Sequence, residues 1–195
     1  MAENDRQKRG RKLLLTLLIV GVVGSIAGIG TFSAFSSTTA NSNNSFAAGT
    51  VYITDNDGGS AMFGVSNAKP GSVSKCITVT YLGSLDANVH LYGSGFGGAL
   101  APYLNLKVEQ GTSSSAFGSC ATFSATSTLY NSGISGFATT YGAGYDTEPG
   151  AGHWATNDAI SYRFTITLAD DNNANGGSSP VASNNFSFTW EAQNV

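Results

Sequence analysis

The chain has 195 residues and a formal net charge of −3, and charged residues make up 11% of it. Five of its nine Lys and Arg residues lie within residues 1–12, and the other four are scattered, so the rest of the chain lacks the clustered cationic surface that nucleic-acid binding requires, which excludes that class. The length fits one ordinary domain with a real hydrophobic core. The abundance of Gly, Ser, Thr, Asn and aromatic residues is typical of an all-β protein.

The N-terminal segment is typical of a signal peptide. Five basic residues lie within residues 1–12, and an apolar run from Leu13 to Ile29 follows them. Small residues come next, as a signal peptidase requires near the cleaved bond, so we expect cleavage after Ser33 or Ala34. Residues 1–33 are therefore predicted to be a helical signal peptide. The alternative is an uncleaved anchor, because the apolar run is close to the length that spans a bilayer.

Export would change the charge of the protein. Removal of the leader takes away five basic and two acidic residues, which leaves ten acidic and four basic residues and a net charge of −6. We expect a secreted protein in the extracellular matrix or at the cell surface. It would touch the membrane only through its uncleaved leader.

An uncharged ribbon, residues 34–48, follows the leader. It consists mostly of small and polar residues, with Phe35 and Phe46 as its large apolar side chains. Composition alone favours a disordered spacer. The alternative is a strand that adds to a free sheet edge and satisfies its unpaired backbone groups.

Residues 49–195 are predicted to form the folded domain. Several short segments alternate apolar and polar residues with the period of two that half-buried strands show. Turn-forming residues separate these segments. Residues 111–159 have weak periodicity, and we expect long loops there, with short strands around 120–124 and 129–130. About eight strands with this spacing predict a jelly-roll-like β-sandwich. The segments are 50–54, 61–65, 76–82, 87–92, 103–108, 160–168 and 186–190.

The chain contains two cysteines, Cys76 and Cys120. An even number in an exported chain predicts a disulfide. By the chain-entropy argument, a bridge over such a long loop stabilises the fold by roughly 4 kcal/mol. The alternative is a pair of buried free thiols. The chain has no C-x-x-C motif that would indicate redox catalysis.

Signals for metal binding and catalysis are weak. Asp171, Asn173 and Asn175 have the spacing of the first half of a calcium loop, but the Glu that completes such a loop is missing. The same residues also favour tight turns, so we expect at most a weak calcium site and no other cofactor. The two histidines, His90 and His153, form no H-E-x-x-H motif, and no G-x-S-x-G elbow is present. We therefore predict no enzyme activity.

Five short stretches together resemble the TasA/camelysin family of secreted bacterial matrix proteins. GTFSAF closes the leader at residues 30–35, and FAAGTVYI follows at Phe46–Ile53. NAKPG and YLGSLDANV lie within residues 65–93, with Tyr81 in place of the family's usual Asn. NNFSFTWEAQ, at residues 184–193, is similar to the family's last strand. Residues 93–158 have no counterpart in this pattern.

The resemblance implies a jelly-roll sandwich, a leader cut by a SipW-type signal peptidase, and extracellular fibres in a biofilm matrix or surface coat. Subunits in such fibres self-associate head to tail by donor-strand complementation. Here Ala34, Phe35 and Phe46 would belong to the donor strand. Two alternatives remain open: a camelysin-like cell-surface metallopeptidase, and a monomeric adhesin or minor fibre component. The sequence shows no metal-binding triad that would favour the peptidase.

Overall fold

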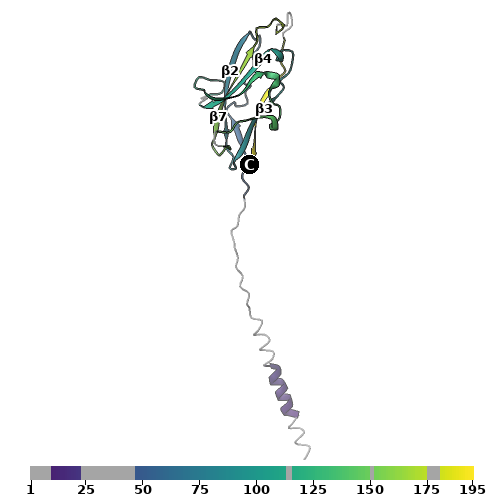
Figure 1. Cartoon of the computed structure of the whole chain (residues 1–195). Coiled ribbons are helices and arrows are strands. Elements are labelled where there is room, and N and C mark those ends of the chain that lie inside the picture. Colours follow the sequence, from purple (N-terminus) through teal and green to yellow (C-terminus); the bar gives the residue numbers. More distant parts are fainter. Residues whose placement is uncertain (1–9, 23–46, 113–115, 150–151, 175–180) are drawn as a thin grey trace, which may run out of the picture. The chain divides into compact units, whose positions relative to one another are not determined.

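The computed structural model describes residues 10–22, 47–112, 116–149, 152–174 and 181–195. The chain divides into two compact units, Met1–Phe46 and Ala47–Val195. In the first unit, residues 10–22 are helical (Figure 1). No helix in the described parts of the chain has both the length and the apolar character needed to cross a bilayer.

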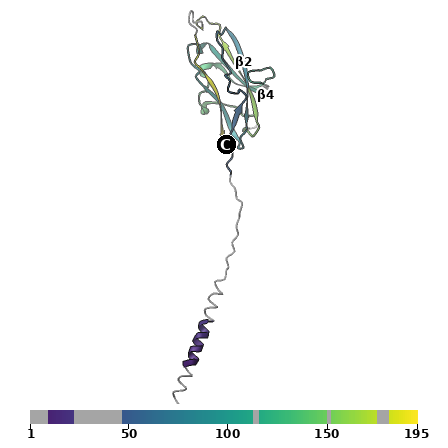
Figure 2. The same cartoon turned by 180° about the vertical axis from the view of Figure 1, so that it is seen from behind.

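The second unit is a β-sandwich, which Figures 1 and 2 show from opposite sides. Its described residues form eight strands in two antiparallel sheets, one of five strands in the order β1-β2-β7-β4-β5 and one of three in the order β6-β3-β8. The chain passes from one sheet to the other at every connection except β1–β2 and β4–β5. The prediction of an all-β sandwich preceded by a helix is confirmed. The strands are β1 (Ile53–Asp55), β2 (Gly71–Tyr81), β3 (Ala87–Ser94), β4 (Leu104–Thr112), β5 (Ser124–Gly133), β6 (Tyr145–Asp146), β7 (Ala159–Leu168) and β8 (Ser187–Asn194).

Short 3-10 helices join several strands. They lie in connections whose turn-forming residues predicted turns between the strands. They are η1 (Ala101–Tyr103), η2 (Ile134–Gly136), η3 (Tyr141–Ala143) and η4 (Asn172–Ala174).

The core lies between the two sheets and follows the period-two pattern. In β3, Val89 and Leu91 are fully buried, whereas the intervening His90 is half-buried. In β7, Tyr162 and Phe164 are fully buried. Alternate side chains of a strand point to opposite faces of its sheet, so the apolar set of each strand meets the other sheet.

Three local predictions are wrong. The short strand expected around 120–124 does not form, because residues 120–123 are a turn and irregular chain that the disulfide holds against the sheet. Residues 61–65 form no strand; they are an irregular segment from which Met62 and Phe63 pack against the core. Residues 124–133, predicted to be mostly loop, form the ten-residue strand β5. β5 lies at the edge of its sheet and is largely exposed, so its residues need not alternate between apolar and polar. Because it is rich in Ser and Thr, the sequence pattern did not indicate a strand there.

A disulfide joins Cys76 in β2 to Cys120, with 5.2 Å between the Cα atoms. It holds the segment 116–123 against the five-stranded sheet. The backbone N–H of Gly118 donates to the Cys76 carbonyl over 2.7 Å, with Gly118 in the left-handed region at a φ of 78°. The Arg163 guanidinium lies 4.9 Å from the centre of the Phe123 ring. These contacts fix the segment at both its ends.

Candidate functional site

One side of the sandwich, which we call its open side, is bordered by an edge strand from each of the two sheets. β1 is the first strand of the five-stranded sheet, and β8 is the last strand of the three-stranded sheet. β8 pairs with β3 along its whole length, from Ser187 to Asn194. No described strand pairs with its other side. Such an edge presents unpaired backbone N–H and C=O groups to any chain that can reach it.

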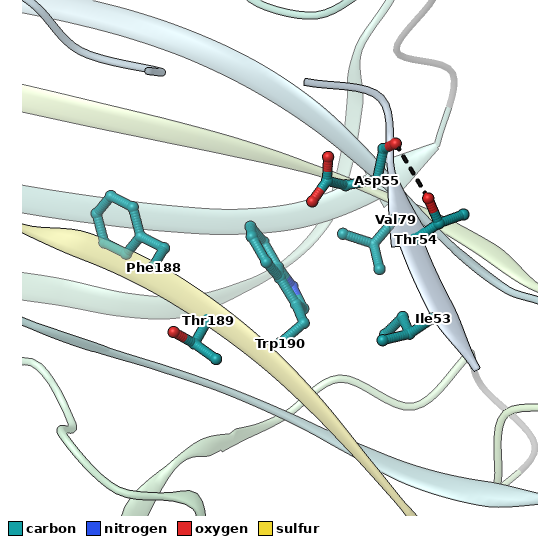
Figure 3. A pocket seen from close by; sticks show the side chains of 7 residues that line it. All are labelled: Ile53, Thr54, Asp55, Val79, Phe188, Thr189 and Trp190. Atoms are coloured by element: carbon teal, nitrogen blue, oxygen red, sulfur yellow. Dashed lines mark hydrogen bonds between the residues drawn. The ribbon is translucent and has the colours of Figure 1, made fainter. Parts of the chain in front are cut away.

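A groove lies between these two edges, and we call it the edge groove. Its first part has a volume of about 220 Å³, and Figure 3 shows its lining, with Trp190 lying between β8 and the β1 residue Ile53. The second part, of about 200 Å³, shares Asp55, Phe188 and Trp190 with the first. The two parts therefore form one continuous depression. The first part is lined by Ile53, Thr54, Asp55, Val79, Phe188, Thr189 and Trp190, and the second also by Met62, Phe63, Phe117 and Phe186.

The edge groove is aromatic because of the pattern at β8. Phe186, Phe188 and Trp190 alternate along the chain and share one face, and all three are only half-buried. Phe188 packs against Phe164 of the core, with 4.3 Å between ring centres. Half-exposed aromatic side chains beside a free strand edge are typical of an interaction surface rather than of a fully buried hydrophobic core.

Two buried polar groups beside the edge groove lack hydrogen-bond partners. They are the indole N–H of Trp190 and the hydroxyl of Tyr162, and neither has a partner within the described residues. Their rings are 5.2 Å apart. Burial raises the pKa of the Tyr162 hydroxyl, so this group stays protonated. Since buried polar groups in folded proteins are nearly always paired, these two groups are exceptions within the described residues, as is Oε1 of Gln110.

Asp55 is the charged side chain at the junction of the two parts of the edge groove. Its Oδ1 accepts a hydrogen bond from the backbone N–H of Asp57 over 3.0 Å. Desolvation raises the pKa of the Asp55 carboxyl, and the charge of Asp57 adds to the effect, whereas the Asp57 N–H opposes it. The ionised carboxylate is therefore less favourable in the folded chain than in the unfolded one.

The raised pKa of Asp55 predicts a pH-dependent gain in stability for Asp55→Asn. The charged form destabilises the fold once the pH exceeds the unfolded pKa, and this destabilisation disappears as the pH falls below that value. We expect the variant to be slightly more stable than the parent chain at pH 7 and equally stable at about pH 3. Urea unfolding at both pH values measures this difference. A variant that is less stable at pH 7 would contradict the assignment.

The residues predicted for cleavage and donor-strand roles, Ser33, Ala34, Phe35 and Phe46, lie outside the described residues. In the predicted calcium loop, Asp171 Oδ1 accepts hydrogen bonds from the backbone and side-chain nitrogens of Asn173, over 2.8 and 3.0 Å. These bonds cap the short helix η4, which is the tight-turn interpretation of that sequence. Asn175 is outside the described residues.

The two histidines do not form a metal site with the nearby acidic residues. The ring of His90 stacks on Tyr141, and His153 hydrogen-bonds to Asn88 and lies 3.8 Å from Glu148. Across the described parts of the chain, no three side chains of the His, Cys, Asp or Glu type are grouped so that they could hold a metal ion. The residues present there do not fit a metallopeptidase centre.

Fold and groove together define an all-β sandwich protein with an N-terminal helix and a groove beside the free edge of β8. The family model described as camelysin metallo-endopeptidase matches residues 10–94. This match covers the helix and strands β1–β3, and it confirms the resemblance to the TasA/camelysin family. No curated protein sequence matches the chain.

Sequence reasoning missed the edge groove, although it found part of its lining. The alternation of Phe186, Phe188 and Trp190 predicted a strand with one apolar face. It could not show that this strand lies at an edge, because strand order depends on pairing between distant segments. Met62 and Phe63 were assigned to a strand, and the structure instead places them in the lining of the groove.

Proposed function

We propose that this protein is a secreted structural subunit of extracellular fibres in a biofilm matrix or surface coat. The ribbon of one molecule, residues 34–48, would add to the β8 edge of the next molecule. The observation that carries the proposal is the free edge of β8 beside an aromatic groove. The confirmed family resemblance supports it.

The chemistry of the ribbon suits this edge. It carries no charge, so burying it against aromatic side chains requires no desolvation of ions. Its backbone would satisfy the unpaired groups of β8, which spans eight residues, and a ribbon of 15 residues is long enough to do so. Phe35 and Phe46 would supply the apolar side chains that fill the groove.

Export would control the assembly. The proposal assigns residues 1–33 to a signal peptide, with cleavage after Ser33 or Ala34, and residues 49–195 to the sandwich domain. Before cleavage, the ribbon is tethered to the leader and cannot enter a neighbour. After cleavage by the signal peptidase, its free end can reach the β8 edge of another subunit. Because donor and acceptor differ, the contact is heterologous and repeats into a filament.

Negative-stain microscopy tests the proposal directly. The processed chain, beginning at Ala34, is expected to form fibres, whereas the chain that lacks residues 34–46 is expected to remain monomeric. Replacement of residues 34–46 by a Gly/Ser sequence of equal length should also abolish fibres, because it removes Phe35 and Phe46 while keeping the length. Fibres from the deleted chain, or none from the intact processed chain, would contradict donor-strand assembly.

The family description favours one second candidate, a cell-surface endopeptidase that uses a metal ion. The described residues offer no grouped ligand set for such an ion. Cleavage of casein by the purified protein distinguishes the two candidates, provided that it is measured with and without a chelator. Activity that a chelator abolishes and added metal restores would favour the endopeptidase.

A further inference from the structure

The outward face of the three-stranded sheet carries a row of polar and aromatic side chains, which we call the polar face. It comprises the side chains that alternate with the buried residues of β3 and their partners on β6 and β8. In the strand register, His90 lies opposite Asp146 on one side and opposite Glu191 on the other. The members of the polar face are Asn88, His90, Tyr92, Asp146, Glu191 and Gln193.

Tyr141 of η3 provides an aromatic platform on this face. Its ring stacks on that of His90, with 4.3 Å between ring centres and 10° between planes. His90 Nδ1–H donates to the Tyr141 carbonyl over 2.9 Å, which fixes the backbone of η3 beside the ring contact. The following residues, Gly142 and Ala143, are small and exposed, and Tyr141 itself is only half-buried. Tyr141 is therefore held by a ring contact and a backbone hydrogen bond, and part of its surface remains accessible to solvent.

Glu191 is held in position beside this platform. Its Oε2 accepts a hydrogen bond from the Tyr92 hydroxyl over 2.7 Å, and its Oε1 accepts one from the Gln193 amide over 2.9 Å. The hydrogen bond from Tyr92 lowers the pKa of the Glu191 carboxyl, and the bond from Gln193 and the charge of His90 add to this effect. Glu191 is thus ionised at neutral pH. Each carboxylate oxygen keeps acceptor capacity for a ligand.

The charge of the polar face is negative. Asp146 and Glu191 lie on β6 and β8, and β3, β6 and β8 contain no Lys or Arg. The cations on described strands, Lys75, Lys107 and Arg163, all belong to the five-stranded sheet. An anionic ligand would therefore be repelled, whereas a cationic one would be attracted.

We propose that the polar face binds a polysaccharide of amino sugars with free ammonium groups. The apolar side of a pyranose ring would pack on Tyr141, while ammonium groups pair with Glu191 and Asp146. Asn88 and Gln193 add amide groups to the same face, where the Oδ1 of Asn88 bonds to His153 and the Nε2 of Gln193 donates to Glu191. Aromatic rings attract ammonium groups as well as apolar surface. A cationic sugar polymer carries both ammonium groups and apolar ring faces. Its successive sugar units could contact successive residues of the polar face.

Calorimetric titration of the full chain with a glucosamine hexamer tests the proposal. We expect saturable binding of this hexamer, and about tenfold weaker binding of an N-acetylglucosamine hexamer, which lacks the ammonium charge. Tyr141→Ala should weaken binding of both hexamers about tenfold. Glu191→Gln should weaken binding of the glucosamine hexamer alone, because it removes the charge and keeps an oxygen that accepts from Tyr92.

Matched controls are available elsewhere on the molecule. Tyr52→Ala removes a tyrosine that is 57% exposed and lies outside the polar face, and Asp170→Asn removes one negative charge at an exposed position outside both the polar face and the edge groove. Both should bind as the parent chain does, and thermal melting should show that every variant is folded. Failure to bind the glucosamine hexamer, equal binding of both hexamers, or equal effects of Tyr141→Ala and Tyr52→Ala would overturn the proposal. Binding needs no fibre, so this result is independent of the assembly test.

Discussion

A synthetic peptide with the sequence of residues 34–48 is expected to stabilise a chain that lacks residues 34–46. The peptide would occupy the edge groove in trans and pair with the open side of β8. A ligand that binds only the folded state stabilises it by about 2.7 kcal/mol when its concentration is a hundred times its dissociation constant. The midpoint of thermal unfolding should therefore rise with peptide concentration. The same peptide in excess should stop the intact processed chain from assembling.

Two changes separate specific insertion from unspecific adhesion of the peptide. A peptide with Phe35 and Phe46 replaced by Ser should give little stabilisation, because it keeps the backbone but loses both apolar contacts. On the acceptor side, Phe186→Ala enlarges the groove at a half-buried position and should weaken peptide binding. Thr165→Ala is the control, because Thr165 alternates with the buried Phe164 on β7 and its hydroxyl pairs with that of Ser74 on the opposite face of the five-stranded sheet. Equal stabilisation by the two peptides would contradict insertion through the phenylalanines.

Replacement of Trp154 by Ala is expected to destabilise the sandwich by about 3–5 kcal/mol, as truncation of a fully buried large aromatic side chain does. Trp154 is 0% exposed, and its indole N–H donates to the Thr147 carbonyl over 2.9 Å. Its backbone exchanges hydrogen bonds of 2.8 and 3.0 Å with Ala87 at the start of β3. The backbone and side chain of Trp154 together thus connect the segment before β7 to the start of β3 and to the segment after β6. Urea unfolding measures the loss.

The two tryptophans of the chain form a matched pair for the hydrogen-bond contribution. Trp154→Phe removes an N–H whose partner is buried, which leaves the Thr147 carbonyl unpaired and costs about 1–3 kcal/mol. Trp190→Phe removes an N–H that has no partner within the described residues, so it loses no hydrogen bond. We expect the first variant to be clearly less stable than the second. Equal stabilities would show that the Trp154 hydrogen bond contributes nothing net.

The all-β class could be predicted from the sequence because strand periodicity is local. The apolar face of 160–168 corresponds to β7 (Ala159–Leu168), and the alternation at 87–92 lies within β3 (Ala87–Ser94). The prediction failed at β5, since an exposed edge strand of Ser and Thr buries little on either face. It also failed at 61–65, where Met62 and Phe63 are apolar because they face the open side of the sandwich and not because they alternate in a strand.

The candidate site was harder to predict than the fold. Its existence depends on β8 lying at an edge and on β1 ending after three residues. β1 is short because the carbonyls of Thr50 and Tyr52 accept hydrogen bonds from the turn at residues 82–85 instead of from a strand. These are non-local pairings, and no pattern within a short window specifies them. The family resemblance pointed towards an added strand, but not towards the edge that would receive it.

The bridge between Cys76 and Cys120 changes what a single peptide-bond break can do to this molecule. It closes a covalent ring that contains most of β2 and all of β3 and β4. Hydrolysis at any one bond inside that ring, including those in the exposed turn at Leu82–Leu85, opens the ring but releases no fragment. Two breaks inside the ring, or one break and a reductant, are needed before a segment between Cys76 and Cys120 can separate from the rest of the chain. For this part of the sandwich, resistance to the loss of a cleaved fragment is thus built into the chain connectivity, independently of how tightly the sheets pack.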